Sequence, residues 1–166
     1  RKYGAPTQWL VDAGMAYYSF NVGSFELPFP SHENMRLYKL FFVDSGLMCA
    51  MVLNGIQAKV LTGDIFVNEG ALAENYVAGE LAKHGVSLNY YDRKSKHELD
   101  FVFPEDDKIT ILEVKSGKDY KKHVSLDMAQ SLFSEKINRR IVMSCNNLEV
   151  EDGVLYLPFY MSMFIV

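Results

Sequence analysis

Two acidic residues and a lysine stand in neighbouring strand-like runs of this sequence. Asp100 lies in 'HELDFVF' and Glu113 in 'ITILEVKS', where Lys115 comes two residues after the glutamate. Charged side chains inside apolar strands are costly unless they are paired or bind something. The segment 'PEDDK' between the two runs is turn-like, so we expect the strands to form an antiparallel hairpin.

This hairpin would bring the two carboxylates together. If Pro104 pairs with Ile109, Asp100 lies opposite Glu113 with Cβ atoms about 5 Å apart. Carboxylates at that separation repel each other, and a hard divalent cation such as Mg²⁺ or Mn²⁺ would resolve the conflict. Lys115 shares the face of Glu113, about 6.6 Å along the strand, where it could hold a water or stabilise a negatively charged transition state. Together these residue types suit phosphodiester hydrolysis.

The alternation of side chains along a strand predicts which way the aspartate points. One face would carry Glu98, Asp100 and Val102, and the other Leu99, Phe101 and Phe103. An Asp-Glu-Lys cluster on such a hairpin also suits a solvent-exposed group of ion pairs with little energetic value. The residues alone leave both interpretations open.

A helix is predicted before these strands, in 'NEGALAENYVAGELAKHG'. Its apolar positions repeat at helical spacing and are Ala71, Leu72, Tyr76, Val77 and Leu81. Gly85 suits its end. Glu74 interrupts the apolar pattern and could point toward the strand site or into solvent, and Glu80 is a weaker alternative.

The other elements follow from turn signals and periodicity. Residues 6–20 predict a short helix that ends near Gly14, followed by a strand, and residues 21–35 predict an exposed connection. We expect a strand at 36–44, a short helix at 45–53 and a connector at 54–64.

The second half of the chain completes a mixed α/β sheet. Strands are predicted at 87–94, 97–103 and 109–116, then a helix at 126–138 and a buried strand at 139–145. The crossover helix favours parallel pairing of the two strands that it connects. The order is therefore helix, three strands, helix, strand, and residues 154–166 suit either a strand or a helix.

Composition limits the classes of function. The chain has 166 residues with 49% hydrophobic content, which suits one domain or one domain with a small appendage. A net charge of -4 argues against a broad basic surface for duplex nucleic acid, although it is compatible with a local cleft. The absence of an apolar run of membrane-spanning length predicts a cytoplasmic protein with no membrane contact.

Two groups of basic residues flank the candidate strands. Lys94 and Lys96 precede the aspartate strand, and Lys118 and Lys121 follow the glutamate strand. They are candidate contacts for a nucleic-acid backbone, and solubilising loop charges are the alternative. Cys49 and Cys145 lie in apolar runs, which predicts buried, reduced thiols.

The pattern 'LD-x12-E-V-K' behind a helix with 'ENYVAGEL' resembles the PD-(D/E)XK nuclease superfamily, which has the restriction-endonuclease-like fold. More narrowly, 'YKLFFVDSGL', 'GALAENYVAGEL', 'YYDRKSKHELDFVF' and 'ILEVKSG' look like the uncharacterised C-terminal domain that follows the ATPase module in prokaryotic AAA-type ATPases. The segment 'LVDAGMAYYSFNV' is similar to the end of the winged-helix segment between those modules. The narrower resemblance covers residues 37–117.

The resemblance implies an αβββαβ core and a metal site for Mg²⁺ or Mn²⁺. The site would consist of Glu74, Asp100, Glu113 and Lys115, with Gln130 as a candidate on the following helix. It also implies a winged-helix remnant at 1–35, a nuclease-like domain at 36–166 and an ATPase module as partner.

Departures from the pattern leave other functions open. Leu99 stands where the superfamily's name has proline, and the chain has no G-x-x-x-x-G-K-[ST] phosphate loop of its own. Besides metal-dependent cleavage of nucleic acid, we consider a catalytically silent interaction or regulatory module. DNA binding without cleavage through residues 1–35 is the third hypothesis.

Overall fold

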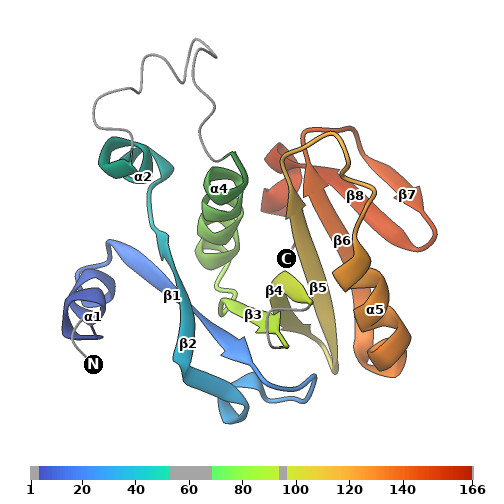
Figure 1. The fold of residues 1–166 in the computed structure, drawn as a ribbon, viewed down its shortest axis with the longest axis horizontal. Coiled ribbons are helices and arrows are strands. Elements are labelled where there is room, and N and C mark those ends of the chain that lie inside the picture. The colour runs from blue at the N-terminus through green and yellow to red at the C-terminus, as the bar shows by residue number, and fades with distance from the viewer. Residues whose placement is uncertain (1–3, 53–68, 94–96, 166) are drawn as a thin grey trace.

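The computed structural model describes residues 4–52, 69–93 and 97–165, which form one mixed sheet with helices on both faces (Figure 1). The first elements are α1 (Gly4–Asp12), β1 (Ala16–Val22), a 3-10 turn (Phe29–Ser31), β2 (Glu33–Phe42) and α2 (Ser45–Val52). The following elements are α4 (Glu69–Lys83), β3 (Asn89–Asp92), β4 (Glu98–Glu105), β5 (Lys108–Lys115) and α5 (Val124–Phe133). The last are a 3-10 turn (Ser134–Lys136), β6 (Ile137–Ser144), β7 (Glu149–Glu151), β8 (Val154–Pro158) and a 3-10 helix (Phe159–Phe164).

The predicted order of helix, three strands, helix and strand is confirmed by α4, β3, β4, β5, α5 and β6. The strands lie in the order β2-β1-β3-β4-β5-β6-β8-β7. β4 and β5 form the expected antiparallel hairpin, in which Pro104 pairs with Ile109. β5 and β6 are parallel, as the crossover through α5 requires. None of the described helices has both the length and the apolar character needed to cross a membrane.

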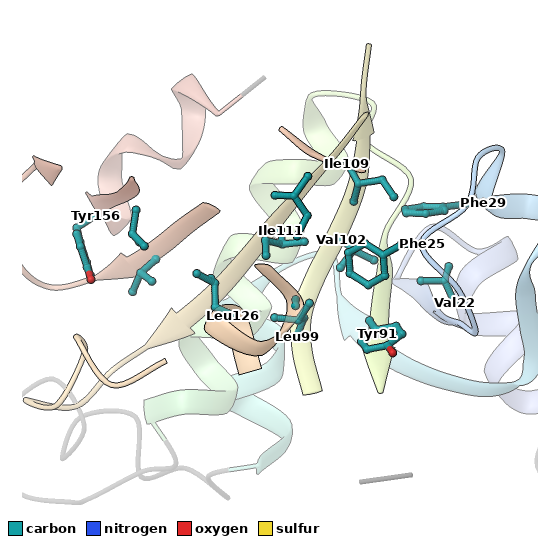
Figure 2. Close-up of a cluster of buried hydrophobic side chains, with 14 residues drawn as sticks. Val22, Phe25, Phe29, Tyr91, Leu99, Val102, Ile109, Ile111, Leu126 and Tyr156 are labelled. Carbon is teal, nitrogen blue, oxygen red and sulfur yellow. The ribbon is translucent and has the colours of Figure 1, made fainter. Parts of the chain in front are cut away.

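Two apolar clusters cover the two faces of the sheet. The cluster on the α4 face joins Val77 and Leu81 of the helix to Phe101 and Leu112 of the hairpin. The cluster on the α5 face contains Leu126 of that helix together with side chains of β4, β5 and β6 (Figure 2). Because each helix buries an apolar stripe against the hairpin, the hairpin is fixed from both sides.

The segment 21–35 is not the exposed connection that its prolines and glycine predict. Phe25 and Phe29 are fully buried in the α5-face cluster. Phe25 stacks on Phe133 with ring centroids 4.5 Å apart and contacts the edge of Tyr91 at 4.9 Å. The two aromatic side chains outweigh the turn residues because their burial is the larger energetic term.

Several smaller expectations are corrected or decided. Tyr76 is exposed, unlike the rest of the predicted α4 stripe, and Cys145 is exposed rather than buried because it directly follows the end of β6. The end of the chain forms both a strand, β8, and a 3-10 helix, and β7 was not predicted. Gly85 has a φ of +80° and suits the end of α4 as expected. The predicted connector at 54–64 lies outside the described residues.

Candidate active site

The strand that carries Asp100 contains an irregularity at this residue. β3 pairs with β4 through Asn89–Val102 and then Tyr91–Leu99, so β4 uses one more residue than β3 between the two pairs. Such an extra residue is a β-bulge, which interrupts the alternation of side chains. Asp100 lies in this bulge, and its carboxylate is near Lys39, whose ammonium also pairs with Glu74 of α4.

The predicted faces of β4 are right for Phe101 and Phe103, which share a face, and wrong for Leu99. Leu99 and Val102 pack together in the cluster on the α5 face, although strict alternation separates them. Phe101 and Phe103 pack on the α4 face. The bulge is the physical reason, since one additional residue reverses the orientation of everything on one side of it.

Asp100 also ends the pairing between β4 and β5. The last backbone pair before it is Phe101 with Leu112, and beyond that pair the N–H of Val114 donates to Asp100 Oδ2 at 2.8 Å. The carboxylate thus takes the place of a backbone acceptor at the point where the strands separate. The side chain of Asp100 is 17% exposed, so it is largely buried but still accessible to solvent.

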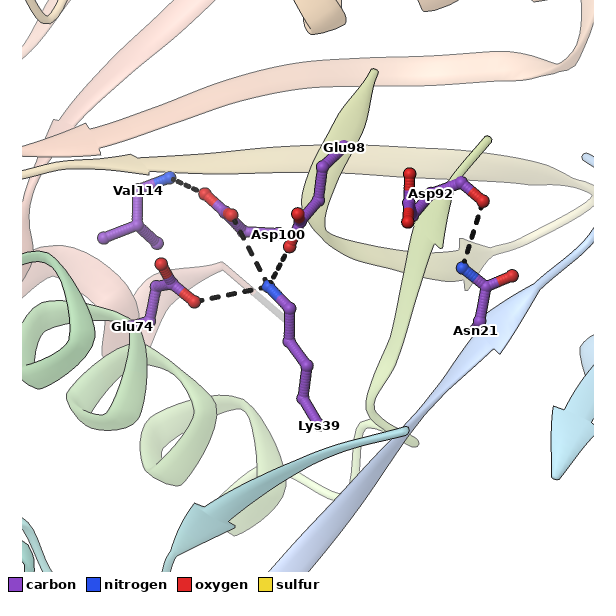
Figure 3. Close-up of polar contacts among 7 residues, drawn as sticks. All are labelled: Asn21, Lys39, Glu74, Asp92, Glu98, Asp100 and Val114. Carbon is purple, nitrogen blue, oxygen red and sulfur yellow. Dashed lines mark hydrogen bonds and ion pairs between the residues drawn. The ribbon is translucent and has the colours of Figure 1, made fainter. Parts of the chain in front are cut away.

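Lys39 of β2 is a member of the site that we did not predict (Figure 3). Its Nζ lies 3.4 Å from Glu74 Oε2 and 3.9 Å from Asp100 Oδ1, and its shortest contact is with Glu98 Oε1. The ammonium also lies 5.3 Å from the centre of the Tyr90 ring. A signal for it was present in the sequence, because it is a charged residue inside the apolar run 'LYKLFFV'.

Glu74, which the sequence left open between the strand site and solvent, lies close to Asp100. It lies on α4, and its carboxylate shares the ammonium of Lys39 with Asp100. The next residue fixes this part of the helix, since the side chain of Asn75 bonds both backbone groups of Phe42 at the end of β2. The N–H of Phe42 donates to Asn75 Oδ1 at 2.7 Å, and Asn75 Nδ2 donates to the Phe42 carbonyl at 3.1 Å.

Glu113 lies on the α5 face of the sheet, whereas Glu74 approaches from α4 on the opposite face. Its neighbours Leu112 and Val114 pack against the α4 face, so alternation directs Glu113 toward the α5 face, as it does for its β6 partner Val142. The side chain is buried, and Glu113 Oε2 lies 2.9 Å from Lys115 Nζ. Within the described residues that oxygen has no hydrogen bond of acceptable geometry.

Asp100 is surrounded by opposing charges. Burial and then the charge of Glu74 raise the pKa of its carboxyl, which reaches about 7 despite the lowering effects of the Val114 N–H and Lys39. The charge of Glu113 also raises the pKa, so carboxylates from both faces act on this one group. Burial lowers the pKa of Lys39, but Glu98, Glu74 and Asp100 outweigh it and raise that pKa above 10.5.

The donor set fits a hard divalent cation in kind. Glu74, Asp100 and Glu113 offer only carboxylate oxygens, which Mg²⁺ and Mn²⁺ prefer, and one buried oxygen of Glu113 makes no hydrogen bond in the described part of the chain. The present arrangement is not a closed cage. Across residues 4–52, 69–93 and 97–165, no three His, Cys, Asp or Glu side chains form a group that could hold a metal ion.

The remaining candidates are placed less directly. Lys94 and Lys96 lie outside the described residues, and Lys118 is exposed after β5. Lys121 is paired with two glutamates of β7, Glu149 at 2.9 Å and Glu151 at 2.6 Å, so a phosphate would compete with both. Gln130 is half-buried on α5.

An open apolar cavity of about 860 Å³ borders the site. It lies between α2, α4 and the carboxyl ends of β5, β6 and β8, and it includes Ala73 and Ser116, the chain neighbours of Glu74 and Lys115. Both cysteines and Tyr76 line it as well. The acidic site thus has a non-polar surface immediately beside it.

Comparison with known families supplies one match. A family model described as a domain of unknown function, DUF4143, matches residues 69–161, which is more than half of the chain. Glu74, Asp100, Glu113 and Lys115 all lie inside the matched segment, and Lys39 lies before it. No curated protein and no solved structure matched the chain.

Proposed function

We propose that this chain, which belongs to the DUF4143 family, carries a metal-dependent nuclease site or one descended from it. The reaction would be hydrolysis of nucleic-acid phosphodiester bonds with Mg²⁺ or Mn²⁺. The observation that carries the proposal is the position of Asp100 at the point where β4 and β5 stop pairing and the Val114 N–H binds its carboxylate. There the charges of Glu74 and Glu113, from opposite faces of the sheet, both raise its pKa. Like-charged groups are rarely gathered in a partly buried place unless a cation or a reaction uses them.

The order of elements supports the same proposal. An αβββαβ arrangement is what the resemblance to the PD-(D/E)XK superfamily implies, and α4 through β6 follow that order. Fold likeness alone does not establish activity. The argument therefore rests on the residues that the hairpin and α4 bring together.

Each residue has a role in this proposal. Asp100 and Glu113 would bind the metal, and Glu74 would support a second ion or metal-bound waters. When bound, the metal supplies an activated water and neutralises charge on the phosphate. Lys115 lies 2.9 Å from Glu113 Oε2 and is partly exposed, so its ammonium can both orient that carboxylate and hold a water or a phosphate oxygen.

The wider setting is part of the proposal. We place the domain at the C-terminal side of an AAA-type ATPase module in a cytoplasmic protein, because four of its motifs resemble that family in order. Residues 1–35 would then be the remnant of the winged-helix segment. Lys94, Lys96 and Lys118 would contact the nucleic-acid backbone, whereas Lys121 would first have to leave Glu149 and Glu151.

A cleavage assay tests the proposal directly. Single- and double-stranded DNA and RNA are incubated with Mg²⁺ or Mn²⁺ and the wild-type chain, Asp100→Asn or Lys115→Ala. We expect metal-dependent cleavage that falls at least about a hundredfold in both variants. Lys83→Ala is the control, because Lys83 pairs with Glu80 elsewhere on α4, and it should cleave like the wild type.

The assay also addresses the competing function, a catalytically silent interaction module. The Lys39 contacts favour it, since an ammonium already balances these carboxylates, and so does the apolar cavity beside them. A folded wild-type chain that cleaves none of the substrates, alone or with its ATPase module added, would favour the silent module.

A further inference from the structure

Lys39 comes from a part of the fold remote from the hairpin. It lies on β2, at the outer edge of the sheet, and two strands separate β2 from β4. β1 pairs with β3 through Phe20–Asn89 and Asn21–Tyr90, and Lys39 pairs with Ser19, the residue of β1 directly before this pairing. The lysine side chain therefore extends from β2 past β1, and its ammonium lies near the Tyr90 ring of β3 and at the acidic site.

The ammonium occupies the place where carboxylates of two elements converge. Glu74 comes from α4 and Asp100 from β4, and Lys39 Nζ is within 4 Å of an oxygen of each. A divalent cation held by the same two carboxylates would have to lie within reach of those oxygens. Two cations in that space would repel each other strongly at partly buried positions.

We infer that Lys39 is a built-in competitor of the metal, which holds the acidic site together in its metal-free form and must leave when a divalent cation binds. This inference rests on the proposed function, since it concerns the same metal site. It goes further by adding a residue outside the family segment that sets how tightly the metal is held.

Lys39 has a partner outside the proposed metal ligands, with which it can stay paired when a metal binds. Its shortest contact is with Glu98, which is 46% exposed and is not one of the carboxylates assigned to the metal. The side chain of Lys39 is itself 24% exposed and flexible, so it can turn toward the solvent side while it stays paired with Glu98. Entry of a metal then requires rotation of one side chain rather than movement of the sheet.

A purely structural role for Lys39 predicts something different. As a clamp between β2, α4 and β4 it would contribute to stability and have no effect on metal affinity, or it would increase affinity by fixing the ligands. Competition predicts the opposite sign, because removal of the ammonium leaves the carboxylates without a cation. The sign of the change in metal affinity therefore separates the two roles.

The test is a Mn²⁺ titration followed by electron paramagnetic resonance of the free ion, with no nucleic acid present. Lys39→Met keeps the length of the side chain and removes its charge, and it should bind Mn²⁺ about tenfold more tightly than the wild type or better. Lys39→Arg keeps the charge and should not bind more tightly than the wild type. Lys83→Met is the control for loss of a lysine that pairs with Glu80, and it should match the wild type.

The other outcomes are decisive as well. If the wild type binds Mn²⁺ and Lys39→Met binds it equally or more weakly, Lys39 does not compete with the metal. The proposed metal site itself is then still supported. If neither protein binds Mn²⁺, both the inference and the proposed metal site fail.

Removal of Lys39 leaves three carboxylates close together, so Lys39→Met could unfold without metal. Circular dichroism during the same titration then gives the readout, because a tighter metal site should refold the variant. A variant that stays unfolded at Mn²⁺ concentrations that saturate the wild type would overturn the inference.

Discussion

The sequence pattern identifies Asp100 as a candidate ligand, and the local structure fixes the position of its carboxylate. A bulge in β4 lies at this residue, and the N–H of Val114 binds one carboxylate oxygen where the pairing of β4 with β5 ends. Burial and the charge of Glu74 both favour the protonated form, and they raise its pKa to about 7. The folded protein therefore binds a proton at Asp100 more tightly than the unfolded chain does.

This difference gives a pH-dependent prediction. The ordinary pKa of 3.8 rises to about 7 on folding, so the stabilising contribution of the protonated group is complete below pH 3.8 and is lost as the pH rises through 7. Asp100→Asn should raise the free energy of unfolding by about 2 kcal/mol near pH 8 and by almost nothing near pH 4, because the amide carries no charge. Urea denaturation across this pH range without divalent cations measures the difference.

The control is Asp119→Asn, which changes an exposed carboxylate that pairs with Lys122. Its effect should be small at both pH values, because the ion pair is exposed to solvent. An Asp100→Asn effect of equal size at both pH values would show that folding does not raise the pKa of Asp100.

At the scale of elements, single side chains attach helices and loops to the sheet. Asn75 on α4 bonds the N–H and the carbonyl of Phe42 and so attaches the helix to the end of β2. This attachment brings Glu74 of the helix close to Lys39 of the strand. The segment after β1 is attached in another way, through the buried ring of Phe25.

Phe25→Ala should therefore cost about 3–5 kcal/mol in the free energy of unfolding, the usual range for a buried phenylalanine. The ring stacks on Phe133 and contacts Tyr91, and a cavity would remain among these aromatic groups. Leu27→Ala is the matched control, because Leu27 lies in the same segment and is 37% exposed, so its cost should stay below about 1 kcal/mol. Equal costs in urea denaturation would mean that the segment is a surface connection, as its turn residues suggested.

At the scale of the whole molecule, the first strands belong to the same sheet as the candidate site. β1 lies between β2 and β3, and the boundary predicted at residue 35 falls inside β2. Val22, Phe25 and Phe29 of the first 35 residues contribute to the α5-face cluster. Removal of this segment would expose an edge of β3 and part of the core.

A chain that lacks residues 1–35 should therefore lose cooperative thermal unfolding, as followed by circular dichroism. A chain that lacks residues 1–12 is the control, because it keeps β1 and loses only α1, and its unfolding should stay cooperative. If residues 36–166 alone unfold cooperatively, they form an independent domain as first predicted. Loss of DNA binding after removal of 1–35 supports a DNA-binding role only in that case.

The sequence by itself determined the mixed sheet, the order from α4 to β6, and the hairpin with Pro104 opposite Ile109. These features depend on local signals, since helical periodicity, strand alternation and turn residues act within about ten residues of each other. The same signals identified Asp100, Glu113 and Lys115 as unusual charges in apolar strands.

The tertiary structure alone decided how those residues are arranged. The bulge at Asp100 depends on pairing with β3, the placement of Lys39 depends on the path of β2, and the burial of Phe25 depends on α5 and β3. Each of these is a contact between segments far apart in the chain, and its energy outweighs the local preference that the sequence expresses. For this reason the acidic residues of the site and Lys115 could be identified from the sequence, whereas the contact of Lys39 with Glu74 and Asp100 could not.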